Sequence, residues 1–353
     1  MKLLLKNSLL PININCFFTL KHKTLLCLMF FYCLTVKTQI ANYVNNGGFE
    51  IPRTSNQQQP VFWSAIDSTK FLGLMYSYTI SPYLVPLSSL TYQWPKSGNA
   101  WFGTTFFYKP NTPQTLRGYP RNTLKATLQA GKTYCVKFYV NITTQSTYGI
   151  DAIGAYFGDN STDTITHCMT PISYLNPQIQ NTSGIITDTL NWVPITGTFV
   201  ANGNEKYMIL GNFKSDAATN SVMINPTNLP LIFTDVLFDD VSCIPIDLPA
   251  YAGADIWAIP GNTVYLGRSQ DVGIDEACTW YNLTNTTTPV ANAAGFSLTV
   301  SAITATYMVK QDICGVIKYD TVVVHASALG NVEWQMLNDK LKLYPNPANE
   351  LLN

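Results

Sequence analysis

The sequence TYCVKFYVNIT, at Thr133–Thr143, indicates the fold class of this chain, because apolar and polar side chains alternate along it. A period of two over eleven residues predicts a β-strand with one buried face. One face carries Tyr134, Val136, Phe138, Val140 and Ile142, and the other carries Cys135, Lys137, Tyr139 and Asn141. The first, uniformly apolar face is the one expected to enter a core.

Similar runs occur on both sides of this strand, and clusters of Gly, Asn and Asp separate them. No amphipathic helix of three turns is evident between residues 39 and 246. Many short strands with turn residues between them predict a β-sandwich or barrel over this range. The other expected strands are Leu124–Leu128, Ile150–Phe157, Pro194–Val200, Tyr207–Phe213 and Leu231–Cys243.

Residues 247–328 form a second expected unit of short strands. Within it Cys278 closely precedes Trp280, and Cys314 follows Cys278 by 36 positions. This pattern is typical of an immunoglobulin-like sandwich, although in antibody domains the tryptophan follows the first cysteine at a greater distance. We expect a disulfide between Cys278 and Cys314, the alternative being two buried free thiols.

The amino-acid composition argues against two classes of protein, nucleic-acid-binding proteins and disordered proteins. Only 12% of the 353 residues are charged, and 21 Lys and Arg balance 21 Asp and Glu. A nucleic-acid-binding protein needs a basic face, and none is visible, so nucleic acid is not an expected partner. The 20 Tyr, 17 Phe and 7 Trp supply material for a core, which argues against disorder.

Residues 1–38 contain five cations and no acid. The apolar run Thr24–Val36 follows the basic segment Lys21–Lys23, which is the layout of a secretory signal peptide cleaved before Gln39. The alternative is an uncleaved anchor helix, for which the run is short. We therefore expect a secreted or outer-cell-surface protein with no membrane span after signal cleavage.

An odd number of cysteines remains after residue 38, so at least one free thiol or an intermolecular bond is expected. An exported chain permits disulfides, and no CxxC motif indicates a zinc or redox site. The pairing of three of them stays open, with Cys135–Cys243 as one possible bond. The five are Cys135, Cys168, Cys243, Cys278 and Cys314.

Signatures of catalysis are missing from the sequence, which contains no HExxH, GxSxG or GxGxxG motif. The two histidines after the leader, His167 and His325, lie far apart along the chain. We therefore assign no catalytic residue. A hydrolase that uses an unrecognised pair of carboxylates remains the enzymatic alternative.

Two acidic segments stand at the ends of the first unit, Asn46–Glu50 (NGGFE) and Phe238–Ser242 (FDDVS). In a sandwich whose first and last strands are neighbours, these acids would meet. Ca²⁺ takes six to eight oxygen ligands from carboxylates and carbonyls, which Glu50 and one of Asp239 or Asp240 could help supply. The alternative is two independent solvated turns.

Residues 39–246 resemble the jelly-roll domains of the carbohydrate-binding-module and galactose-binding type. The resemblance rests on NGGFE, a downstream Trp63, the strand TYCVKFYVNI, the block WVPITGTFVANGNEKYMILGNF and the closing FDDVSC. It implies a structural calcium held by Glu50 and Asp240, with Asp239 as a substitute. The expected fold class is therefore all-β, a jelly-roll β-sandwich followed by an immunoglobulin-like β-sandwich.

The segment Leu343–Asn349 (LYPNPAN) resembles the start of a type IX secretion sorting domain. Residues 329–353 are accordingly interpreted as a linker and a truncated sorting signal, and the resemblance implies the type IX secretion machinery as a partner. The unit at 247–328 resembles the immunoglobulin-like or PKD-like spacers that precede such signals.

We expect a non-catalytic binding protein with a polysaccharide or glycan as ligand, because aromatic rings stack on sugars while amides and acids hold hydroxyls. The alternative is an adhesive or structural module with a surface protein as partner. Candidate platforms in the loop-rich part of the chain are Trp63, Trp94, Trp101 and Tyr108. The candidate ligand-binding residues are Trp63, Lys137, Tyr139 and Asn141.

Overall fold

The computed structural model describes residues 39–52, 60–66, 74–78, 93–108, 117–165, 171–226 and 233–327. The predicted leader at 1–38, the predicted linker and sorting signal at 329–353, and Cys168 lie outside these residues. Within the described part of the chain, no helix combines the length and apolar character needed to cross a membrane.

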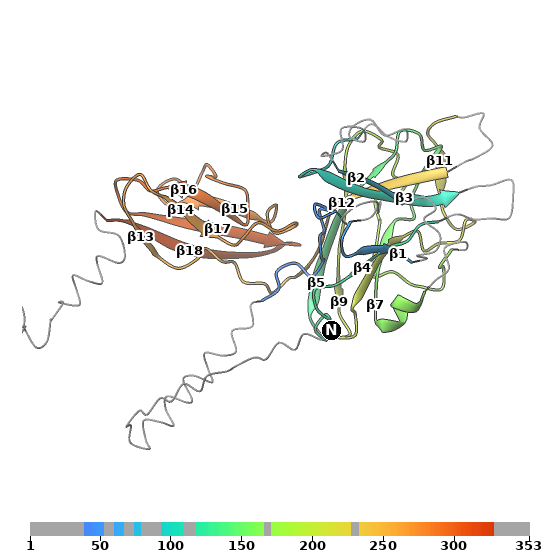
Figure 1. Cartoon of the computed structure of the whole chain (residues 1–353), viewed down its shortest axis with the longest axis horizontal. Helices are drawn as coiled ribbons and strands as arrows, with labels where there is room; N and C mark the ends of the chain where they lie inside the picture. The colour runs from blue at the N-terminus through green and yellow to red at the C-terminus, as the bar shows by residue number, and fades with distance from the viewer. Residues whose placement is uncertain are drawn as a thin grey trace, which may run out of the picture. The chain divides into compact units, whose positions relative to one another are not determined.

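Two five-stranded sheets build the first sandwich, in the orders β1-β4-β10-β7-β8 and β2-β3-β12-β5-β9, and a two-stranded sheet pairs β11 with β6 (Figure 1). Every pairing within them is antiparallel. The strands are β1 (Trp63–Ala65), β2 (Leu74–Tyr78), β3 (Ala100–Tyr108), β4 (Pro120–Thr123), β5 (Thr133–Ile142), β6 (Tyr148–Ile150), β7 (Gly154–Gly158), β8 (Ile179–Gln180), β9 (Val193–Val200), β10 (Tyr207–Gly211), β11 (Ser221–Met223) and β12 (Phe233–Pro245), with a 3-10 turn η1 (Asn160–Thr164) after β7.

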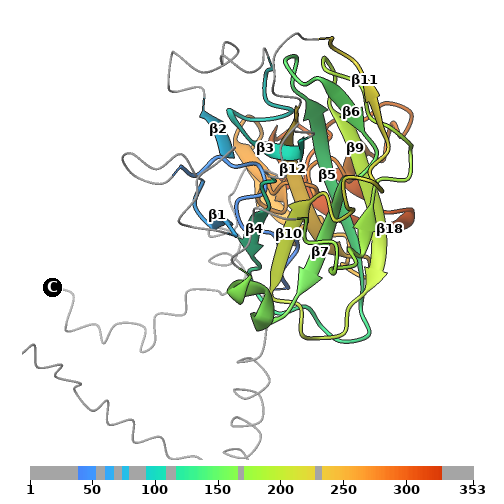
Figure 2. The ribbon, with the colours of Figure 1, turned by 90° about the vertical axis from the view of Figure 1, so that its right-hand side faces the viewer.

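The alternation along β5 places its apolar face in the core. Val136, Phe138 and Val140 are fully buried, and the same cluster contains Met208 and Leu210 of β10, in the other sheet. Burial of this face against the opposite sheet removes apolar surface from water, which stabilises the sandwich by about 25 cal/mol per Å². Figure 2 shows β4, β10 and β7 side by side in that other sheet.

The second sandwich pairs a four-stranded sheet, β13-β18-β17-β15, with the two-stranded sheet β14-β16. A second hydrophobic cluster surrounds Trp280, whose side chain is fully buried, and extends to Cys135 of β5 and Ile244 of β12. The all-β prediction is confirmed. These strands are β13 (Ile256–Ala258), β14 (Thr263–Gly267), β15 (Cys278–Asn282), β16 (Gly295–Thr299), β17 (Ala305–Ile313) and β18 (Val316–Ala326).

The predicted Cys278–Cys314 disulfide is wrong, because Cys314 bonds to Cys135 of β5 instead. Cys278 lies opposite Gln311 in the β15–β17 ladder and faces the core as a free thiol. Cys314 stands in the turn that follows Ile313, where its φ of 49° takes the chain out of the ladder. The side chains of Cys278 and Cys314 therefore do not meet.

The alternative bond, Cys135–Cys243, is excluded as well, since Cys243 is a buried free thiol. Cys135 belongs to the outward face of β5, whereas Cys243 lies in the apolar core. Burial raises the pKa of the Cys243 thiol, which keeps it protonated and unreactive.

Candidate functional site

A pocket of about 190 Å³ lies in the first sandwich, over a row of residues that crosses three strands. Gly211 of β10 pairs with Gly154 of β7, and Gly154 pairs with Gln180 of β8. Two facing glycines leave this part of the sheet without side chains. A Cβ on Gly211 would come within 2.3 Å of the Tyr119 ring, so glycine is required where the ring crosses the strand.

The pocket belongs to the face of the sheet that points away from the main core. Along β10, Met208 and Leu210 enter the core, whereas Ile209 between them joins a second cluster with Tyr119 and Phe213. Phe213 also lines the pocket. This alternation gives the pocket an apolar wall on one side.

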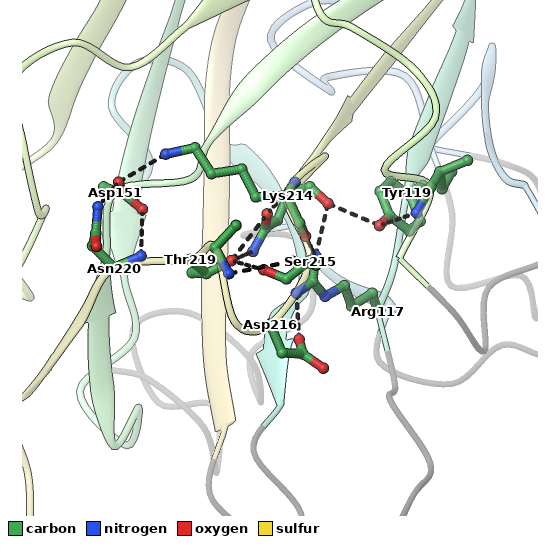
Figure 3. A network of polar contacts seen from close by, with 11 residues as sticks. Arg117, Tyr119, Asp151, Lys214, Ser215, Asp216, Thr219 and Asn220 are labelled. Atoms are coloured by element: carbon green, nitrogen blue, oxygen red, sulfur yellow. Dashed lines mark hydrogen bonds and ion pairs between the residues drawn. The ribbon is translucent and has the colours of Figure 1, made fainter.

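A charged pair, Asp151 and Lys214, lines the pocket. Figure 3 shows the contacts of this pair. Lys214 donates to Asp151 Oδ2 at 2.9 Å, and Asn220 donates its backbone N–H to Oδ1 at 3.0 Å and its side-chain Nδ2 to Oδ2 at 2.8 Å. Burial favours the protonated acid, but the hydrogen bonds from Lys214 and Asn220 outweigh it and lower the pKa of Asp151. Asp151 is therefore ionised and its charge is neutralised locally.

The loop that carries Lys214 is fixed from beneath by Arg117, whose side chain is fully buried. Its Nη1 donates to the carbonyls of Asn212 and Lys214, and its Nη2 pairs with Asp216 (Figure 3). Tyr119 adds a hydrogen bond from its hydroxyl to the Asn212 carbonyl at 2.8 Å. These contacts hold the pocket wall in place before any ligand arrives.

Tyr174 provides an open aromatic surface at this pocket. Its side chain is 72% exposed, and it lines the pocket with Asn176 and Pro177. An exposed ring beside amide and charged groups can take an apolar ring face on one side and hydroxyl groups on the other. The pocket can thus bind a neutral, hydroxylated ring.

Two of the candidate ligand residues lie in the interior instead. Trp63 is fully buried, packs against Phe49 and Phe102, and donates Nε1–H to the Asn46 carbonyl. Asn141 is also fully buried. Neither reaches a surface ligand, because the first fills the space between the sheets and the second is covered on the outward face of β5.

The other two candidates, Lys137 and Tyr139, both contact Glu276 from the chain that follows the first sandwich. The Tyr139 hydroxyl donates to Glu276 Oε2 at 2.6 Å, and Lys137 Nζ lies 3.0 Å from Oε1. Tyr139 is only 8% exposed. Their polar groups are thus engaged with another part of the protein rather than aimed at solvent.

The acidic segments at the ends of the first sandwich meet at residues 96–100. Glu50 Oε1 accepts from the N–H groups of Asn99 and Ala100 at 2.7 and 3.0 Å. Asp239 Oδ2 accepts from the Lys96 and Ser97 N–H groups at 2.8 and 3.4 Å. Asp240 Oδ1 accepts from the Ser97 hydroxyl at 2.7 Å.

A β-bulge explains how two successive acids reach the same segment. Neighbouring strand residues ordinarily point to opposite faces, but the β12–β5 register shifts between Asp239 and Ser242, and Asp240 has a φ of 50°. Burial and the charge of Asp240 raise the pKa of Asp239, and burial also raises the pKa of Asp240. A bound cation would offset the free-energy cost of burying these carboxylates in their ionised form.

The donor set fits calcium in part. An ideal Cβ on Gly48 would lie 3.8 Å from both Asp240 Oδ1 and Glu50 Cγ, so the two acids flank one glycine. Glu50 uses Oε1 for both of its backbone hydrogen bonds, which leaves Oε2 for a cation. Within the described ranges, no group of three His, Cys, Asp or Glu side chains is placed to hold a metal ion, so carbonyls or water would have to supply most of the shell.

Sequence reasoning missed the pocket residues Asp151, Tyr174 and Lys214, because they stand in loops and follow no motif spacing. One signal was present in the strands. Gly154 and Gly211 interrupt two otherwise apolar runs, and a glycine inside a strand marks a close approach or an open site.

No protein-family model and no curated protein matches this sequence. Among solved structures, the chain is similar to carbohydrate-binding modules and to gingipain adhesin domains. The CBM22-1 xylan-binding domain of Paenibacillus barcinonensis Xyn10C has 12% identity and a TM-score of 0.30, covering 58% of this chain and 92% of that one. The K1 cleaved adhesin domain of Lys-gingipain from Porphyromonas gingivalis W83 has 15% identity and a TM-score of 0.28, covering 56% and 95%. The N-terminal cellulose-binding domain of Cellulomonas fimi β-1,4-glucanase C has 11% identity and a TM-score of 0.27, covering 58% and 97%.

Proposed function

We propose that the first sandwich binds a neutral polysaccharide in the pocket over Gly154 and Gly211, and that the protein is a non-catalytic binding protein of the cell exterior. The observation that carries this proposal is the exposed Tyr174 ring beside the neutralised pair Asp151–Lys214 in a preformed pocket. A sugar ring presents an apolar face to Tyr174 and hydroxyls to the charged pair.

Pocket size favours one ring of a longer chain as the occupant. Its volume of about 190 Å³ is below the roughly 300–1,000 Å³ of sites that enclose a drug-sized ligand. The half-open surface beside Asn176 and Gln180 lets neighbouring sugars continue across the protein. Charge balance at Asp151 and Lys214 selects neutral sugars over uronic acids.

The same pocket is poorly arranged for hydrolysis. Glycosidases use two carboxyl groups, one of which must hold a proton at working pH. Asp151 is the one carboxylate among the described residues that line the pocket, and its pKa is lowered by Lys214 and Asn220. It therefore lacks both the partner and the proton that a general acid needs.

Export also has structural support. The Cys135–Cys314 bond joins residues 179 positions apart, and such bonds persist in oxidising compartments. A secreted or outer-surface location is accordingly part of the proposal. The route through the type IX secretion machinery stays a prediction from the sequence.

Replacing Tyr174 by alanine should weaken polysaccharide binding about 10- to 30-fold, because the stacking surface is lost while the fold is kept. Affinity electrophoresis in gels containing xylan, β-glucan or mannan measures this change. Tyr319→Ala is the matched control, since Tyr319 is 58% exposed in the second sandwich. Equal retardation of the Tyr174 variant and the unaltered protein would contradict the assignment.

We also propose that Glu50 and Asp240, together with carbonyls or water, hold a structural Ca²⁺ beside residues 96–100. At a concentration of about 100 times its dissociation constant, such an ion stabilises the folded state by about 2.7 kcal/mol. Calcium should therefore raise the melting temperature by several degrees over that in a chelator.

Glu50→Gln should remove this calcium response, because it deletes a charged ligand and keeps an oxygen that accepts from Asn99 and Ala100. Asp163→Asn is the control, since Asp163 lies at the exposed turn η1. Differential scanning calorimetry with Ca²⁺ and with EDTA separates the variants. Identical melting curves of the unaltered protein in both buffers would refute the calcium proposal.

A further inference from the structure

Two tryptophans lie together near the edge of the sheet that does not carry the pocket. Trp192 precedes β9, and its Nε1–H donates to the backbone carbonyl of Trp94 at 2.9 Å. Trp94 is 57% exposed and Trp192 is half-buried. Neither residue lines the pocket at Gly154 and Gly211.

A residue near each of the two tryptophans is hydrogen-bonded to a strand of the sheet. Two residues after Trp94, the Lys96 N–H donates to the buried carboxylate of Asp239. On the other side, Asn141 of β5 donates from Nδ2 to the Asn191 carbonyl at 3.1 Å. Both indoles are thus attached to fixed backbone, which reduces the entropy lost when a ligand binds.

Polar groups suited to hydroxyls stand just before Trp192 in the chain. Asp188 Oδ1 accepts from the N–H groups of Leu190 and Asn191, and its Oδ2 accepts from the Asn191 side chain. Burial alone would raise the pKa of Asp188, but the hydrogen bonds from Asn191 lower it, so the carboxylate is ionised. An indole with a carboxylate and an amide nearby matches the two sides of a sugar ring.

We propose that Trp94 and Trp192, with Asp188 and Asn191, form a second saccharide-binding surface on this protein. Its occupant is a neutral sugar chain that stacks on the exposed indole of Trp94 and is hydrogen-bonded beside it. The surface and the pocket belong to different sheets, so one molecule can hold two sugar chains. The proposal stands independently of the pocket, because it uses none of the pocket residues.

Intrinsic fluorescence separates the two sites, because no tryptophan is among the described residues that line the pocket. The probes are soluble hexasaccharides of xylose, glucose and mannose, titrated into the full-length protein. At least one should change the tryptophan emission in a saturable manner. Trp94→Ala should remove most of this change and raise the dissociation constant about 10-fold. Tyr174→Ala should leave it intact.

Two controls keep the test decisive. Trp257→Ala removes a tryptophan of the second sandwich that is 36% exposed, and should leave the sugar response unchanged. Circular dichroism establishes that Trp94→Ala is folded, which is expected because only the Trp94 carbonyl takes part in the bond to Trp192. A response to none of the hexasaccharides, or one that survives Trp94→Ala, overturns the second surface. Loss of polysaccharide binding by the Tyr174→Ala variant in affinity electrophoresis tests only the pocket, not the second surface.

Discussion

Replacing both Cys135 and Cys314 by serine should lower the free energy of unfolding by about 3–5 kcal/mol and the melting temperature by about 10 °C. The bond closes a loop of 179 residues, so its loss releases a large amount of conformational entropy in the unfolded chain. The partly buried contacts of Glu276 with Lys137 and Tyr139 remain in the variant and do not replace the covalent link.

Calorimetry with and without a reducing agent checks this prediction. Reduction should destabilise the unaltered protein to the level of the double variant, and should leave the double variant unchanged. Cys278→Ala is the matched control, because Cys278 is a free thiol and its substitution leaves the response to reductant intact. Peptide mapping without reduction should recover Cys135 joined to Cys314. Recovery of a Cys278–Cys314 peptide would show that the second sandwich closes on itself instead.

The failed disulfide prediction shows the limit of a spacing argument. Strand alternation correctly indicates that Cys135 points away from the core between the sheets of the first sandwich, because the period of two depends only on backbone geometry. The place of Cys314 depends on a turn that begins after Ile313, and a shift of one residue there changes which way the side chain points. Spacing from Cys278 contains no information about that turn.

Part of the candidate site could be predicted from the sequence, and part could not. That Glu50 lies near Asp239 and Asp240 follows from topology, since the first and last segments of the sandwich are neighbours, and all three acids hold residues 96–100. Which aromatic residues are exposed does not follow from the sequence. Trp63 and Tyr174 are both large aromatics near turns, yet one is fully buried and the other is 72% exposed.

Asp235→Asn should change how the stability of the protein depends on pH. The Asp235 side chain is buried on the outward face of β12 and accepts a hydrogen bond from the Thr105 hydroxyl at 2.6 Å. Burial raises the pKa of Asp235 from 3.8 to about 6, while the bond from Thr105 opposes that rise.

The direction of this pH dependence follows from the folded state binding the Asp235 proton more tightly than the unfolded state does. Below pH 3.8 the carboxyl is protonated in both the folded and the unfolded chain, and its full contribution to stability is present. As the pH rises from 3.8 to about 6, the unfolded chain loses this proton freely, whereas the folded chain must keep it or bury a charge. The shift corresponds to about 3 kcal/mol of stability lost between the two limits.

Unfolding by urea at pH values from 3 to 8 measures this loss. The unaltered protein should lose about 3 kcal/mol more across the range than Asp235→Asn, which keeps an oxygen for Thr105 and has no charge to bury. Thr105→Val should move the transition to higher pH, because it removes a hydrogen bond that favours the charged form. Parallel stability profiles for the unaltered protein and Asp235→Asn would contradict the prediction. A buried carboxylate held by one hydroxyl cannot ionise without a free-energy cost, so such profiles would mean that water or a cation already compensates the Asp235 charge.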